Sequence, residues 1–122
     1  MQIVDTNIIL RYMLEDHEEH SPAARKIIDE NDVEVPIEVL CEVVFVLHKV
    51  YSIERKKISA ELLDFFANTG CNMHHKDAVL YGIKIFANNK LDFVDCILAG
   101  YKQIYDYKIY TFDKKLNKIM EL

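Results

Sequence analysis

Short extended apolar stretches alternate along the chain with longer stretches of helical periodicity. The first pair, Ile3 and Val4, is β-branched, as in a strand that is buried on both faces of a parallel sheet. We expect strands at residues 3–4, 33–36, 71–74 and 108–111. Strands that alternate with helices are parallel and joined by right-handed crossovers. The sequence therefore predicts an α/β fold of three layers, α/β/α, around a central parallel sheet of about four strands.

Apolar residues recur at helical spacing between these strands. Ser21, Ser52 and Asp92 are the residues that we expect to cap three of the helices. The helices are expected over residues 8–14, 22–31, 37–51, 53–70, 77–88, 92–104 and 116–120.

Length, composition and net charge limit the kinds of protein that this chain can be. The 122 residues suit a single domain, 1–122, and 51% hydrophobic with 29% charged residues allow a packed core. The apolar runs are too short to cross a bilayer and no signal peptide opens the chain, so we expect a cytoplasmic protein without a membrane partner. The net charge of −5 argues against binding nucleic acid with the whole surface, but it fits an acidic site that concentrates cations.

The three cysteines cannot all pair with one another. Cys41, Cys71 and Cys96 lie in apolar surroundings and lack metal-site spacing. We therefore expect buried, reduced thiols.

Two carboxylates directly follow predicted strands. Asp5 ends the first strand and Asp113 follows the last one. Open α/β sheets bind ligands at the carboxyl ends of their strands, so both are candidate site residues. Each is also well placed to cap the helix that follows it, and for Asp113 alone this reading is as good as the functional one.

Two further acids stand out by their position. Glu42 is the only charged residue between Glu38 and His48, within a strongly apolar helical stretch, where an unpaired carboxylate is costly. Glu38 lies one turn earlier on the same face and is the fallback. A salt bridge or a solvated helix edge remains the alternative for Glu42. Asp92 and Asp95 are three residues apart at the start of a predicted helix, and we expect Asp92 to cap this helix and Asp95 to act in the site.

Clustered carboxylates repel one another unless a cation neutralises them. Oxygen ligands alone suit Mg²⁺ or Mn²⁺, without histidine or cysteine. Such an ion activates water and neutralises charge on a phosphodiester, which is the chemistry of metal-dependent nucleases.

These motifs resemble the acidic signature of PIN-domain nucleases, and the small VapC-type toxins in particular. The matching elements are Val4-Asp5-Thr6-Asn7, Leu40-Cys41-Glu42-Val43, Asp92-Phe93-Val94-Asp95 and Thr111-Phe112-Asp113. The resemblance covers nearly the whole chain. It implies a Mg²⁺- or Mn²⁺-dependent endoribonuclease, the toxin of a toxin–antitoxin pair, that forms a homodimer and is inhibited by a cognate antitoxin.

The resemblance also implies roles for individual residues. Asp5, Asp95 and Asp113 would be metal ligands, and Glu42 would complete the catalytic acids. Accessory roles fall to Asp92, Thr111, Asn7 and Glu38. The chain ends at Leu122, so an edge strand that is often found in the family is expected to be missing.

Arg11, about one turn into the first helix, could hold an RNA phosphate or lie on a solvated face. Tyr101, Tyr105, Tyr107 and Tyr110 fit core or dimer packing better than stacking on bases. Three other functions stay open: an RNA-processing PIN nuclease without an antitoxin, a phosphorylatable receiver-like switch, and an inactive binding module. The receiver-like switch is disfavoured because neither middle strand ends in an acceptor aspartate.

Overall fold

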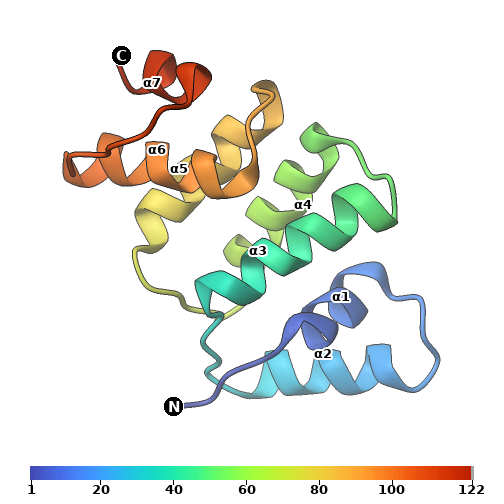
Figure 1. Cartoon of the computed structure of the whole chain (residues 1–122). Coiled ribbons are helices and arrows are strands. Elements are labelled where there is room, and N and C mark those ends of the chain that lie inside the picture. Colours follow the sequence, from blue (N-terminus) through green and yellow to red (C-terminus); the bar gives the residue numbers. More distant parts are fainter. Residues whose placement is uncertain (122) are drawn as a thin grey trace.

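The computed structural model describes residues 1–121 as a predominantly helical structure (Figure 1). Its helices are α1 (Thr6–Leu14), α2 (His20–Glu30), α3 (Ile37–Phe45), the π-helix η1 (Val46–Val50), α4 (Arg55–Asn68), α5 (Lys76–Asn88), α6 (Phe93–Tyr105) and α7 (Lys114–Met120). The predicted helices are thus present, with shifted boundaries at several ends. The stretch 37–51, predicted as one helix, is divided into α3 and η1.

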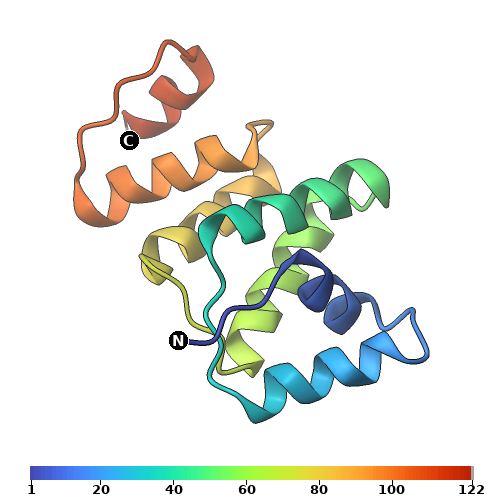
Figure 2. The same ribbon diagram turned by 60° about the horizontal axis from the view of Figure 1, so that its bottom comes forward.

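The predicted central parallel sheet of about four strands is wrong. Within residues 1–121 the structure has no sheet, only two isolated parallel bridges, Ile3 with Glu34 and Glu34 with Asn72. The amide of Glu34 donates to the Gln2 carbonyl at 2.7 Å. On the other side, the amide of Val35 donates to the Asn72 carbonyl at 2.7 Å. Three of the predicted strands therefore lie side by side, in parallel, without extending into a ladder (Figure 2).

The neighbouring elements explain why these segments stay so short. Helix α1 begins at Thr6, two residues after Val4, and α3 begins directly after Pro36, which has no N–H to donate. The fourth predicted strand, 108–111, is part of a segment between α6 and α7 that forms no bridge with the described residues. Tyr110 and Phe112 of that segment are exposed.

Two of the three predicted caps are also wrong in detail. Helix α2 begins at His20, ahead of Ser21, and Ser52 has a left-handed backbone (φ 55°) in the turn before α4. Asp92 does occupy the N-cap position of α6, but its side chain makes no capping hydrogen bond there.

One hydrophobic core joins the helices. It includes Leu40 and Val43 of α3, Leu62 of α4 and Ile83 of α5, all almost fully buried. Helices α5 and α6 form the most extensive helix pair, and two glycines, Gly82 and Gly100, lie where their backbones approach each other. This pair supports the first turn of α6, which carries Asp95.

The prediction of buried, unpaired cysteines is confirmed for Cys71 and Cys96, whereas Cys41 is less buried than expected. All three cysteines are free, with Cys71 and Cys96 buried and Cys41 half-buried. Burial raises the pKa of Cys96 to about 12, so this thiol stays protonated at neutral pH.

Candidate functional site

Asp5 joins the N-terminal extended segment to α1. Its Oδ1 accepts a hydrogen bond from the amide of Ile8 at 3.1 Å, so Asp5 caps the helix. The side chain is exposed, and only one of its two oxygens is used in this bond. Capping and ligand binding are therefore compatible at this residue.

A cavity of about 510 Å³ opens beside Asp5, between the start of α1 and the outer face of α3. Glu38 and Glu42, one turn apart on α3, line it together with Asn7 and Arg11 of α1. We call it the acidic cavity. The structure thus brings together five of the residues that the sequence singled out.

Glu42 reaches this cavity for a different reason from the one the sequence suggested. The apolar stretch around it predicted a carboxylate in an apolar setting, but Glu42 is exposed. Helix α3 turns Leu40, Val43 and Val44 into the core and leaves Glu38 and Glu42 on the opposite side. The cost of burying a charge therefore does not apply to Glu42.

A second set of acids lies at the start of α6 and α7. Asp95, in the first turn of α6, is half-buried. Burial raises its pKa, and the charges of Asp113 and Asp92 raise it further. The charges of Asp113 and Asp92 therefore disfavour the ionised form of Asp95.

Hydrogen bonds with neighbouring residues in the sequence fix the position of Asp113. Its Oδ1 accepts from the amide of Leu116 at 2.8 Å and so caps α7. The hydroxyl of Thr111 accepts from the amide of Asp113 at 3.0 Å, and the Thr111 carbonyl accepts from Asn117 at 3.0 Å. Thr111 thus fixes the backbone that carries Asp113.

The carboxylates fit a divalent cation by donor type, because Mg²⁺ and Mn²⁺ prefer oxygen ligands. They do not fit it by spacing. Among residues 1–121, no three acidic, histidine or cysteine side chains are close enough together to hold one ion. The predicted acids lie instead in two sets, one at the acidic cavity and one around Asp95.

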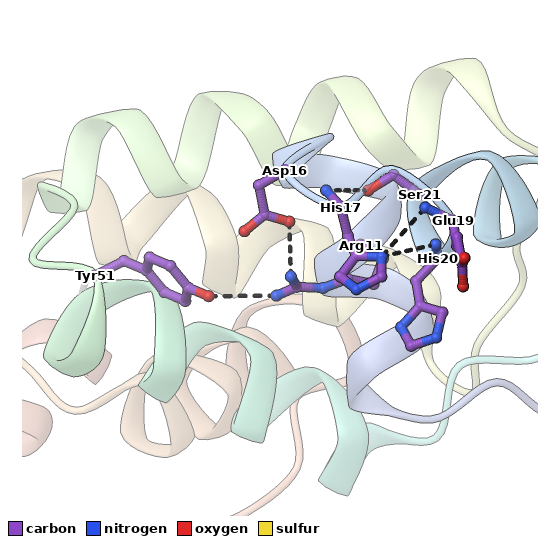
Figure 3. A network of polar contacts seen from close by, with 7 residues as sticks. All are labelled: Arg11, Asp16, His17, Glu19, His20, Ser21 and Tyr51. Carbon is purple, nitrogen blue, oxygen red and sulfur yellow. Dashed lines mark hydrogen bonds and ion pairs between the residues drawn. The ribbon is translucent and has the colours of Figure 1, made fainter.

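Arg11 is fixed in a polar network rather than free in solvent. It donates to Asp16 at 2.7 Å and to the Tyr51 hydroxyl at 3.2 Å, and its side chain is only 19% exposed (Figure 3). The bond to Tyr51 and the charge of Asp16 raise its pKa, although burial opposes them. Arg11 is therefore a permanent positive charge on the wall of the acidic cavity.

Sequence reasoning missed His17, His20 and Tyr51. The Nδ1 atom of His17 accepts from the amides of Glu19 and His20, at 3.3 and 2.9 Å, and the two imidazoles stack with centroids 4.1 Å apart (Figure 3). These histidines line a cavity of about 530 Å³ that shares Asp5, Asn7 and Arg11 with the acidic cavity. The three-residue spacing of His17 and His20 was the available signal.

The chain matches the family model of the PIN domain over residues 3–122. It belongs to the PIN domain family. No curated protein and no solved structure matches the chain. All four predicted catalytic acids lie within the matched residues.

Family membership places the chain in a nuclease-type fold family. PIN domains are generally metal-dependent nucleases, typically bind divalent metals, and act on RNA. They are typically α/β, whereas this PIN domain is mostly helical over residues 1–121. Within the same residues, no helix is long and apolar enough to cross a membrane.

Proposed function

We propose that this PIN domain is a Mg²⁺- or Mn²⁺-dependent endoribonuclease and the toxin of a toxin–antitoxin pair. The observation that carries the proposal is the family match, which includes Asp5, Glu42, Asp95 and Asp113. Single-domain organisation over 1–122, a homodimer, a cognate antitoxin and a cytoplasmic location belong to the same proposal.

We propose Asp5, Asp95 and Asp113 as the metal ligands, with Glu42 completing the acidic site; to hold one ion, the two sets of acids would have to lie closer together than they do in this structure. Held by these residues, Mg²⁺ or Mn²⁺ would supply charge neutralisation at a phosphodiester and a water of lowered pKa. Around it, Asn7, Glu38, Asp92 and Thr111 have accessory roles.

The polar network supports the role given to Arg11. Its bonds to Asp16 and Tyr51 hold a positive charge beside Asp5. We propose that this charge attracts an RNA phosphate toward the acids, as cationic side chains position nucleic acids without reading their sequence.

Cleavage of RNA by the purified chain, free of antitoxin, tests the proposal. We expect cleavage with Mg²⁺ or Mn²⁺, loss of cleavage on chelation, and loss with Asp5→Asn or Asp95→Asn. Induction in cells should arrest growth, and Asp5→Asn should relieve the arrest. Absence of cleavage with both ions, together with an unchanged effect of Asp5→Asn in cells, would refute the proposal.

The separation of the acids into two sets favours one second candidate, an inactive binding module. Calorimetric titration with Mn²⁺ distinguishes the two. Binding that is lost in Asp95→Asn supports the nuclease, whereas absence of binding supports the inactive module. A nuclease that processes RNA without an antitoxin would cleave RNA but would lack a small antitoxin gene beside its own.

A further inference from the structure

A third cavity, of about 350 Å³, lies on the far side of η1 from the acidic cavity and has a different character. Three of its lining side chains are basic, His48, Lys49 and Arg55, and others are aromatic, including Phe45, Phe86 and Phe93. One acid, Asp92, also lines it. The chain has a net charge of −5, yet this cavity combines two cations, Lys49 and Arg55, and an imidazole with aromatic side chains.

Arg55 and Phe86, which form the floor of this cavity, are held by hydrogen bonds and aromatic contacts. Arg55 donates from Nη1 to the carbonyls of Asn89 and Leu91, at 2.7 and 2.8 Å, and its guanidinium lies 4.3 Å from the centroid of the Phe86 ring. The Phe86 ring also meets His48 edge to face, with centroids 5.7 Å apart. Arg55 is thus a positive charge fixed against an aromatic face.

The rim is more accessible than the floor. Phe45 is 60% exposed although its large ring is apolar. Lys49 is exposed beside it, and burial together with the charges of Lys49 and Arg55 lowers the pKa of His48. A lowered pKa keeps the His48 imidazole neutral at neutral pH, where it can still donate a hydrogen bond, so Lys49 and Arg55 are the cations that favour an anionic ligand here.

The π-helix η1 connects this cavity to the candidate site. Val46 and Val50 line the acidic cavity, whereas His48 and Lys49 line the third cavity. π-Helical turns are rare and occur frequently at functional sites. Through Asp92, the third cavity also adjoins the acids around Asp95.

We propose that this cavity binds one nucleotide of the single-stranded RNA substrate, with the base stacked on Phe45 and the phosphate at Lys49 and His48. The inference rests on the proposed function and names the subsite where the RNA is held beside the acids. Aromatic faces and cations together are how proteins hold single-stranded nucleic acid without reading its sequence. An acidic peptide would use the cations but not the aromatic rim.

Fluorescence anisotropy with a labelled single-stranded RNA tests the proposal. Asp95→Asn serves as the background so that the RNA is not cut, and Phe45→Ala and Lys49→Ala are added to it. Lys84→Ala, which removes the same charge from an exposed position on α5, is the matched control. We expect Phe45→Ala to weaken binding about tenfold. Lys49→Ala should reduce the slope of log affinity against log salt by about 1, with Lys84→Ala unchanged.

A second measurement uses the wild-type chain and adenosine 5′-monophosphate. The proposal predicts that this nucleotide shifts the NMR resonances of the His48 imidazole and that Phe45→Ala abolishes the shift. A shift with a short polyglutamate but not with the nucleotide would overturn the proposal in favour of an acidic protein partner.

Failure of the subsite and failure of the proposed function are distinguishable. If the wild type cleaves RNA while Phe45→Ala and Lys49→Ala bind RNA as Lys84→Ala does, the subsite is refuted and the nuclease stands. If the wild type does not cleave RNA, the proposed nuclease function is refuted. The nucleotide titration then still tests the subsite: a shift of the His48 resonances supports nucleotide binding in the third cavity, and no shift refutes it.

Discussion

Gly100→Ala tests the close approach of α5 to α6, the helix that carries Asp95. Gly100 lies in α6 where it crosses α5, and a Cβ atom there would overlap the Ala78 carbonyl oxygen. It would also stand 3.0 Å from the Ala78 carbonyl carbon and 3.4 Å from the Gly82 nitrogen. These are backbone atoms of α5, so the overlap is relieved only if the two helices move apart.

Two opposing effects determine how much Gly100→Ala changes the free energy of unfolding. Alanine is favoured over glycine in a helix interior by about 1 kcal/mol. Overpacking costs about 3 kcal/mol when the obstacle cannot rotate away, at the upper end of the usual range. The variant should therefore be less stable by about 2 kcal/mol, which for a chain of this size lowers Tm by about 8 °C.

Urea unfolding followed by circular dichroism measures this effect. Gly70→Ala is the matched control, because its Cβ would meet no atom within 4 Å and its φ is not positive. We expect an unchanged midpoint for Gly70→Ala, within about 0.5 kcal/mol. A Gly100→Ala variant as stable as the wild type would show that α5 and α6 are not in contact as described.

Further predictions concern the caps, the third cavity and pH. Asp5→Ala should destabilise the fold by about 1 kcal/mol because it removes the cap of α1, whereas Asp5→Asn should retain most of the stability. Thermal unfolding of both variants measures the effect of the cap separately from any loss of RNA cleavage. Arg55→Ala should lower the free energy of unfolding by about 3 kcal/mol, since it removes charged hydrogen bonds to the turn between α5 and α6, and a loss below 1 kcal/mol in urea titration would contradict this. The pKa of Asp95 is raised in the folded state by burial, Asp113 and Asp92, so the wild type loses stability as pH rises from the ordinary aspartate range through that folded pKa. Asp95→Asn should therefore be more stable than the wild type at pH 7 and equal to it at about pH 3; Tm measured across this range checks the sign.

The sequence predicted the helices well because their signal is local. Apolar residues at helical spacing identified the cores of α1 to α7, and Asp113 was recognised as a possible cap as well as a site residue. Boundaries were less accurate, because Ser52 could not be seen to lie in a left-handed turn. The π-helical turn η1 has no distinct periodicity over its five residues and was read as a continuation of α3.

The acids were visible in the sequence, but their grouping was not. Asp5, Glu42, Asp95 and Asp113 were found by residue type and position alone. Which of them share a cavity depends on how α1, α3 and α6 pack, and this packing placed Glu38 and Glu42 with Asp5, and Asp92 and Asp113 near Asp95. The third cavity likewise joins residues that are far apart in sequence, Phe45 and Phe93 among them.

By itself, the sequence determined the helical segments, the unpaired cysteines and the identity of the candidate acids. Only the tertiary structure decided that the extended segments meet in two isolated bridges without a sheet, and that the acids divide into two sets. The physical reason is the range of the interactions. Helical periodicity and caps involve residues three or four apart, whereas strand pairing and cavities depend on contacts between distant parts of the chain.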